Sequence, residues 1–286
     1  MPEVVVLGEG GGWHAGQLAQ ALRDRGAKVE RLRFDQCRLE AGAVRLGLRE
    51  TLPDAVVVRS IPGGTFEQVT LRLGLLHALR EAGVLVVNDA RAIERCVDKA
   101  ATSFLLAKSG VPTPPAWAME CREAAARLLA TEKDLVLKPL FGAQGKGLKR
   151  IRQVEDLPEA DAVAGVWYLQ RYVGRSERWQ DYRVLVVAGR PIAAMARVGV
   201  SWITNIKQGA SPEPVETSGE LGDLAVAAAA AVGAFYAGVD LIETTPGSIE
   251  VLEVNSMPAW QGLQSVAPVD VAQELARGVL AALCRG

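Results

Sequence analysis

Acidic and amide side chains alternate with apolar residues near the C-terminal end of the chain. Glu253 and Asn255 stand two residues apart in an apolar run, and side chains two residues apart in a strand share one face. Val239–Ile242 predicts another strand, and Pro246-Gly247 predicts the turn between the two. A hairpin with that turn places Asp240 directly opposite Glu253.

Two carboxylates that face each other across a largely buried hairpin repel each other unless a cation compensates them. Mg²⁺ is a hard cation that prefers oxygen ligands, so Asp240, Glu253 and Asn255 predict a Mg²⁺ site. The alternative is an ordinary hairpin with solvated acids. The same register also pairs Glu243 with Glu250 beside the turn, where water can screen the two charges.

A glycine-rich segment follows the predicted strand Leu135–Lys138 and leads directly into another strand. A lysine at the end of a buried strand, followed by the backbone N–H groups of a loop, suits a phosphate lid over a nucleotide. The segment is no Walker A loop, because the G-x-x-x-x-G-K-[ST] pattern and a following helix are absent. A plain hairpin with a glycine-rich turn is the alternative. The lid residues are Gly142, Gln144, Gly145, Lys146 and Gly147.

A second glycine-rich run lies between the first predicted strand and the first predicted helix. Gly10, Gly12 and Ala15 fit the G-x-G-x-x-A pattern of dinucleotide-binding turns. The run is longer than a tight turn of that type, and the acidic residue expected after the second strand is ambiguous between Glu30 and Asp35. An NAD(P)-linked oxidoreductase therefore stays open as an alternative function.

Composition indicates an ordinary soluble protein. Of the 286 residues, 49% are apolar and 23% charged, and 32 basic against 33 acidic residues give a net charge of −1. We therefore expect no nucleic-acid partner and, with no long apolar run, no membrane association. With only two histidines, His14 and His77, we expect no zinc site. Four widely spaced cysteines predict reduced thiols and a cytoplasmic protein: Cys37, Cys96, Cys121 and Cys284.

Strands and helices alternate in the first third of the chain, which predicts a small parallel sheet covered by helices on both faces. The predicted strands there are Val4–Leu7, Val29–Arg33, Ala55–Arg59 and Val84–Val87, and the helices are Ala15–Arg25 and Phe66–Ala82. Later strands pair as hairpins, so the fold class is α/β with α+β character. Their predicted ranges are Leu135–Lys138, Leu148–Arg152, Val166–Tyr172, Tyr182–Val187 and Pro191–Val198, with helices Lys99–Ser109, Asp223–Ala237 and Val271–Cys284.

One ordered series of motifs runs through the chain: Asp98-Lys99, Leu135–Lys138 with Gly145-Lys146-Gly147, Leu169–Val173, Asp181-Tyr-Arg183, Gly238-Val-Asp240 and Leu252–Ser256. This series resembles the ATP-grasp superfamily, and within it the RimK-like α-L-glutamate ligases. The resemblance implies three subdomains, with a Rossmann-like sheet in residues 1–93 and two ATP-grasp subdomains in residues 94–172 and 173–286. It also implies that ATP lies between those two subdomains and activates a carboxylate as an acyl phosphate, which an amine then captures.

The resemblance implies roles for individual residues. Lys99 and Lys138 would contact phosphates, and Asp181 would bind the ribose. Arg183 and Arg197 would lie near the transferring phosphoryl group, so that they and Lys138 form the catalytic set. The hinge that reads adenine through backbone groups would be Gln170, Arg171, Tyr172 and Val173, with Arg171 replacing the usual acidic residue. The metal ligands would be Asp240, Glu253 and Asn255, holding Mg²⁺ or, alternatively, Mn²⁺.

Departures from RimK proper concern the acceptor. The segments around Trp202, Asn205 and Trp260 resemble the branch that adds L-glutamate to a coenzyme, a pterin or a furan C1 carrier, and both tryptophans would flank a flat acceptor. We expect an ATP- and Mg²⁺-dependent carboxylate–amine ligase that forms a homo-oligomer. A ligase acting on a protein or an amino-group carrier protein is an alternative, as is a nucleotide-binding subunit without activity.

Overall fold

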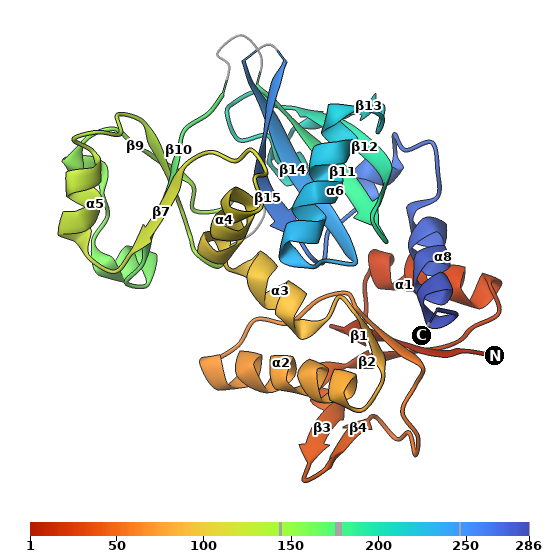
Figure 1. Cartoon of the computed structure of the whole chain (residues 1–286). Helices are drawn as coiled ribbons and strands as arrows, with labels where there is room; N and C mark the ends of the chain where they lie inside the picture. The colour runs from red at the N-terminus through yellow and green to blue at the C-terminus, as the bar shows by residue number, and fades with distance from the viewer. Residues whose placement is uncertain (143–144, 175–178, 246, 286) are drawn as a thin grey trace.

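The computed structural model describes residues 1–142, 145–174, 179–245 and 247–285, which form three main sheets (Figure 1). The first sheet is parallel, with the order β2-β1-β5-β6. Helix α1 covers the face that carries Val4 and Val6, and α2 covers the face of Val5 and Leu7, as predicted. The bounds are β1 Glu3–Gly8, α1 Trp13–Asp24, β2 Lys28–Arg33, β5 Ala55–Val58, α2 Phe66–Glu81 and β6 Leu85–Val87.

Two elements of this region were not predicted. A short antiparallel hairpin pairs β3 (Cys37–Glu40) with β4 (Ala43–Leu46). Its first strand is largely exposed, so it carries little of the apolar alternation that marks a strand. Helix α3 (Ala90–Val97) starts at Asp89, whose carboxylate accepts a hydrogen bond from Ala92 N at 2.8 Å. Such an N-cap is a local signal that could have revealed the helix.

The central sheet is antiparallel, has the order β7-β10-β8-β9, and stands to the left in Figure 1. One face packs against α5 around a core of its own that includes Leu137, Trp167 and Leu169. The bounds are β7 Ala116–Met119, α5 Arg122–Leu128, β8 Leu135–Lys138, β9 Lys149–Ile151 and β10 Trp167–Arg171. A small sheet with a separate core can position the lysine at the end of β8 independently of its neighbours.

The third sheet is antiparallel and has the order β13-β12-β11-β14-β15. Helix α6 was predicted too long, because Gly233 ends it in a left-handed conformation (φ 76°) and the chain continues as a strand at Tyr236. The edge strand β13, which contains two prolines, was not predicted. The bounds are β11 Gln180–Val187, β12 Arg190–Val198, β13 Ser211–Val215, α6 Glu220–Val232, β14 Tyr236–Thr245 and β15 Ser248–Asn255.

The register of the last hairpin decides which acids face each other. Asp240 pairs with Glu253, as predicted. The expected pair of Glu243 with Glu250 is wrong, because the register shifts between Asp240 and Leu241, so Glu250 lies opposite Ile242. A bulge of this kind re-aims side chains on one strand of a pair. Of the two acidic pairs expected in this hairpin, Asp240–Glu253 forms and Glu243–Glu250 does not.

The first and third sheets share one hydrophobic core, in which Leu18 of α1, Val187 of β11 and Leu275 of α8 (Val271–Leu283) all take part. Helix α4 (Lys99–Lys108) contributes Leu106 to the core beneath the third sheet. The expected subdomain boundary after residue 93 falls inside α3. Within the described part of the chain, no helix has the length and apolar character needed to cross a membrane.

His14 joins the N-terminal sheet to the segment after β15. The half-buried ring accepts hydrogen bonds at Nε2 from Trp260 N at 3.0 Å and from Gln261 N at 3.3 Å. Burial, together with the nearby charges of Arg59 and Lys207, lowers the pKa of His14 from 6.5 to about 4. The joint therefore requires neutral imidazole.

Acidification should weaken this joint. Because the folded pKa of about 4 lies below the unfolded value of 6.5, the contribution of His14 to stability is complete above pH 6.5 and is lost as the pH falls toward 4. We expect the free energy of unfolding, measured with urea, to fall between pH 6.5 and about pH 5. His14→Gln should flatten that slope, whereas His77→Gln, at an exposed histidine, should keep it. Equal slopes in both variants would contradict the assignment.

Candidate active site

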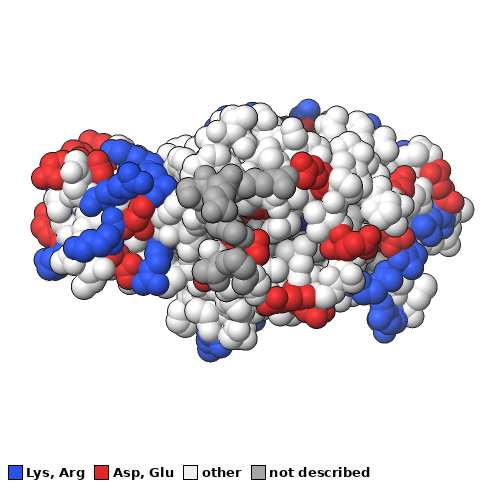
Figure 2. Space-filling model, turned by 90° about the horizontal axis from the view of Figure 1, so that it is seen from above, with Lys and Arg blue, Asp and Glu red and all other residues white. Residues whose placement is uncertain are grey.

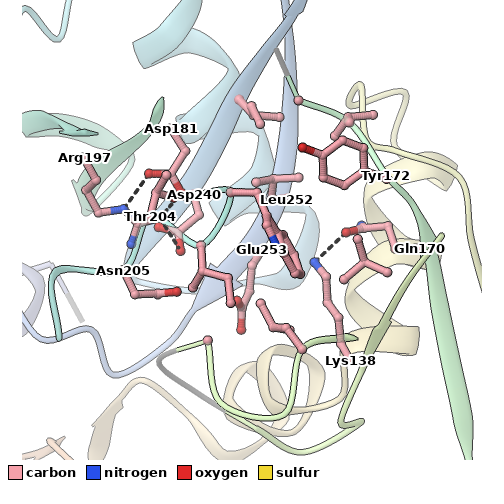
Figure 3. A pocket seen from close by; sticks show the side chains of 18 of the residues that line it. Lys138, Gln170, Tyr172, Asp181, Arg197, Thr204, Asn205, Asp240, Leu252 and Glu253 are labelled. Carbon is pink, nitrogen blue, oxygen red and sulfur yellow. Dashed lines mark hydrogen bonds and ion pairs between the residues drawn. The ribbon is translucent and has the colours of Figure 1, made fainter. Parts of the chain in front are cut away.

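A cavity lies between the central sheet and the third sheet (Figure 3). It is bounded by β8 and β10 on one side, by β11, β12, β14 and β15 on the other, and by the glycine-rich loop. Most of the predicted site residues line it: Lys99, Lys138, Gly142, Gly145, Lys146, Gln170, Arg171, Tyr172, Val173, Asp181, Arg197, Trp202, Asn205, Asp240 and Glu253.

The remaining predicted site residues lie elsewhere. Arg183 lies behind Asp240, and Gly147, Asn255 and Trp260 are not among the described residues that line the cavity. The expectation for Gln144 lies outside the described residues. Figure 2 shows that on one face the basic side chains gather toward the two ends of the molecule, where they mix with acidic ones, and that acidic side chains also lie between the ends. That face offers no single-sign field of the kind that nucleic acid requires.

A buried ion-pair network forms one wall of the cavity. The guanidinium of Arg197 donates to Asp181, with Nε–Oδ1 at 2.7 Å, and its Nη2 lies 3.2 Å from Asp240 Oδ2. Arg183 adds two hydrogen bonds of 2.7 Å to the same Asp240 carboxylate. Burial by itself raises the pKa of Asp240, but Arg183 and Arg197 outweigh that effect and hold it below its usual value.

These contacts correct one step of the sequence argument. The charge of Asp240 is compensated by two guanidinium groups, so the Asp240–Glu253 pair does not by itself demand a metal ion. Arg197 is 3% exposed and is held by two carboxylates, so a contact with a transferring phosphoryl group requires it to exchange partners. In this geometry, Arg197 first of all stabilises the buried ion-pair network that forms one wall of the cavity.

Two lysines, Lys99 and Lys138, line the same cavity as Glu253. Lys99 Nζ lies 3.5 Å from Glu253 Oε1 and donates to Gly142 O at 2.7 Å, at the start of the lid. Lys138 Nζ donates to Gln170 Oε1 at 2.5 Å (Figure 3). The pKa of Lys138 is lowered to about 8, chiefly by burial and also by the charge of Lys99, against the opposing effect of Glu253. The cavity thus concentrates positive charge where phosphates would lie.

The donor chemistry fits a Mg²⁺ ion held by few protein ligands. Asp240 and Glu253 are cross-strand partners and both line the cavity. Asn255 donates from Nδ2 to Gly238 O at 3.3 Å and lies outside the lining. No group of three His, Cys, Asp or Glu residues that could hold a metal occurs in the described ranges. One or two carboxylates completed by phosphate oxygens and water is the usual arrangement for Mg²⁺ in nucleotide sites.

In the predicted hinge, Gln170–Val173, two backbone N–H groups are already hydrogen-bonded within the protein. The side chain of Arg171 turns toward Glu132, with hydrogen bonds of 2.9 and 2.6 Å, which explains why its basic character is tolerated there. The backbone N–H groups of Arg171 and Tyr172 donate to Pro115 O and Asp134 O. Neither N–H is therefore available to a base.

The two tryptophans expected to flank an acceptor have different surroundings. Trp260 is 1% exposed, and its ring packs edge-on against His14 and beneath Arg59, with the guanidinium carbon 4.4 Å from the ring centroid. The expectation that Trp260 flanks an acceptor is wrong in this structure, because the segment after β15 folds back into the core. Trp202 lies beside Tyr172, at the hinge end of the cavity.

Several lining residues were missed by the sequence analysis. The apolar walls include Val136, Leu148, Ile242 and Leu252. Val136 stands two residues before Lys138 on the same strand, so strand alternation could have identified it. Thr204, which hydrogen-bonds to the Asp181 carboxylate, belongs to a loop without a periodic pattern, and no local signal marks it.

Loss of Arg197 should destabilise the fold strongly. Arg197→Met leaves the buried Asp181 carboxylate without a cationic partner and takes one of two guanidinium groups from Asp240, and removal of one member of a buried ion pair typically costs about 3–5 kcal/mol. Arg33→Met removes an exposed pair with Asp35, with side chains 55% and 63% exposed, and should cost about 1 kcal/mol or less. Urea denaturation at neutral pH compares the two variants, and similar losses would contradict the structural role.

The comparisons with known proteins agree with this geometry. The RimK-like ATP-grasp domain family matches residues 96–279. The tetrahydromethanopterin:alpha-L-glutamate ligase of Methanococcus maripaludis is 39% identical over 227 residues, which cover 76% of this chain and 76% of the relative. The protein of the same name from Methanosarcina acetivorans is 32% identical over 243 residues, covering 73% of this chain and 74% of the relative. A solved structure of the ATP-grasp ligase PsnB, complexed with minimal precursor, Mg and ADP, has a TM-score of 0.76 at 25% identity and covers 99% of this chain and 98% of that chain.

Proposed function

Because the chain belongs to the RimK-like ATP-grasp family, we propose that it is an ATP- and Mg²⁺-dependent ligase that adds L-glutamate to a carboxylate of a pterin-type coenzyme. The names of the relatives from Methanococcus maripaludis and Methanosarcina acetivorans support glutamate and the pterin. A furan-type acceptor has no such support. The cytoplasmic location and the homo-oligomer stay predictions.

The observation that carries this proposal is the chemistry of the cavity. Its described lining brings Lys99, Lys138 and Arg197 together with Asp240 and Glu253, and contains no Ser, Cys or His. The described lining therefore offers no Ser–His or Cys–His pair for acyl-enzyme chemistry. It can instead neutralise and align charge, which is what phosphoryl transfer demands of a protein.

The reaction divides into two steps. A carboxylate oxygen of the acceptor attacks the γ-phosphorus of ATP, the bond from that phosphorus to the bridging oxygen breaks, and ADP leaves. The amine of glutamate then attacks the acyl carbon, phosphate departs, and the amine proton passes to solvent or phosphate. Lys99 and Lys138 would hold the phosphates, while Mg²⁺ at Asp240 and Glu253 would supply charge neutralisation.

An acyl phosphate must be kept from water until the amine arrives. Lys99 donates to Gly142 O at the start of the glycine-rich loop, so the same ammonium that would contact a phosphate also holds the lid. Gly145 and Gly147 adopt φ of 70° and 74°, a region that favours glycine. The loop conformation is therefore encoded by glycine at these two positions.

The alternatives gain no support from the comparisons. In the N-terminal turn, the side chain of Arg33 lies against Gly10, where a Cβ atom would be 2.6 Å from Arg33 Cγ. Glu30 and Asp35, the two candidates for a ribose-binding acid, lie in ion pairs with Arg49 and Arg33. These contacts leave an NAD(P) site without an obvious free acid.

The test is a defined reaction. The protein is incubated with ATP, Mg²⁺, L-glutamate and tetrahydromethanopterin, and ADP release is measured together with the mass of the pterin. We expect ADP and a gain of one or more glutamyl units, with no product when aspartate replaces glutamate or when ATP is omitted. ADP release without pterin modification would contradict the acceptor, and thermal stabilisation by NAD(P)H but not by Mg-ADP would contradict the ligase.

A further inference from the structure

The segment Trp202–Asn205, here called the strap, crosses the cavity from the third sheet and contacts both ends of it. At the hinge end, the Trp202 ring meets the Tyr172 ring edge-on, with centroids 6.1 Å apart and planes at 75°. At the lid end, Gly145 packs so closely on the strap that a Cβ atom there would lie 2.9 Å from Ile203 Cγ2 and would also clash with Asn205 Oδ1. One short segment therefore contacts both the hinge and the lid.

The hinge contact belongs to a layered arrangement. The guanidinium carbon of Arg150 lies 3.2 Å from the centroid of the Tyr172 ring and 5.8 Å from that of Trp202. Arg150 is itself fixed by Asp134, with Nε–Oδ1 at 2.8 Å. Arg150 and Asp134 belong to the central subdomain and Trp202 to the loop between β12 and β13 of the third sheet, so the stack joins the two walls of the cavity. Such a position suits a flat ring.

The middle of the strap is anchored. Thr204 is 9% exposed and hydrogen-bonds to the carboxylate of Asp181. Asp181 is in turn held by Arg197 in the buried network. The strap is therefore held at its centre by the buried network rather than being a loose loop.

We propose that Trp202 is a binding residue for the nucleotide base and that the strap links the base to the glycine-rich lid. The ligand class is a nucleoside diphosphate or triphosphate whose planar base lies against Trp202 and Tyr172. The apolar lining supplied by Val136, Leu148 and Leu252 fits such a base, whereas the lysines fit its phosphates. The inference rests on the proposed function and replaces the expected contact of Trp202 with the acceptor.

The test separates the base from the phosphates. Binding of Mg-ADP and of Mg-pyrophosphate, which has no base, is measured by calorimetry for the unmodified protein and for Trp202→Ala, Trp202→Phe and Trp13→Ala. We expect Trp202→Ala to weaken ADP binding about tenfold and to leave pyrophosphate binding unchanged, because a lost aromatic contact acts on the base alone. Trp202→Phe should restore most of the affinity, and Trp13→Ala, at a partly exposed ring on α1, should not change it.

The link to the lid has its own readout. Gly145→Ala and Trp202→Ala are combined, and the loss of ADP affinity in the double variant is compared with the product of the two single losses. If the strap connects both sites, the double loss should be smaller than that product by about twofold or more. Independent effects would overturn the link.

The outcomes distinguish the two proposals. Equal ADP affinity in Trp202→Ala, or equal losses for ADP and pyrophosphate, would overturn the base contact. An increase in the KM of the pterin alone would return Trp202 to the acceptor and overturn it too. Failure of the unmodified protein to bind ADP would overturn the proposed function itself. If Trp202→Ala does not fold, Trp202→Phe and Tyr172→Leu carry the same comparison.

Discussion

Replacing Glu253 by glutamine is expected to lower turnover by about a hundredfold or more while the fold is retained. Glu253 faces Asp240 across the hairpin and shares the cavity with Lys99 and Lys138. Glutamine keeps the shape but removes the anionic oxygen that Mg²⁺ prefers, so charge on the transferring phosphoryl group is less well neutralised. Loss of one such electrostatic contact typically costs two to three orders of magnitude in turnover.

The measurement is steady-state ADP release at saturating ATP, glutamate and pterin across a series of Mg²⁺ concentrations. Glu250→Gln serves as the matched control, because Glu250 lies on the same strand but outside the described cavity lining. Thermal stability without Mg²⁺ should change little, since Asp240 is already compensated by Arg183 and Arg197. Turnover near that of the unmodified protein would exclude Glu253 as a metal ligand.

Replacing Lys138 by methionine is expected to weaken ADP binding about ten- to a hundredfold, the usual effect of losing a charge-assisted hydrogen bond to phosphate. The lysine also gives the affinity a pH dependence. Its pKa in the protein is about 8, lowered from 10.5 chiefly by burial. The ammonium is therefore present below pH 8 and is lost as the pH rises above it, although a bound phosphate restores the proton.

Calorimetry with Mg-ADP from about pH 7 to pH 9.5 checks both parts of this prediction. The affinity of the unmodified protein should fall above pH 8, and that of Lys138→Met should be lower throughout and nearly flat. Lys133→Met, at a lysine that donates to Ala130 O on the surface of the central subdomain, should retain the pH dependence. A falling affinity in Lys138→Met as steep as in the control would assign the titration to another group.

Local sequence patterns were enough to predict most of the strands and helices. Runs of Val and Leu with turn residues between them determined the parallel strands β1, β5 and β6, because a strand buried on both faces has to be apolar at nearly every position. The strand period and the position of the turn determined that Asp240 and Glu253 face each other. The order of the motifs then determined the family, since each motif follows from chemistry that recurs at similar spacing.

Tertiary structure alone decided how those residues are used. Arg183 and Arg197 compensate Asp240 across 57 and 43 positions of sequence, and no local pattern records such a pairing. Trp260 became core because its segment returns to His14, 246 residues away, while Trp202 came to lie at the hinge because its loop crosses between two sheets. Sequence periodicity reports which face of an element is apolar, but burial and charge compensation depend on which elements meet, and that is settled only when the whole chain packs.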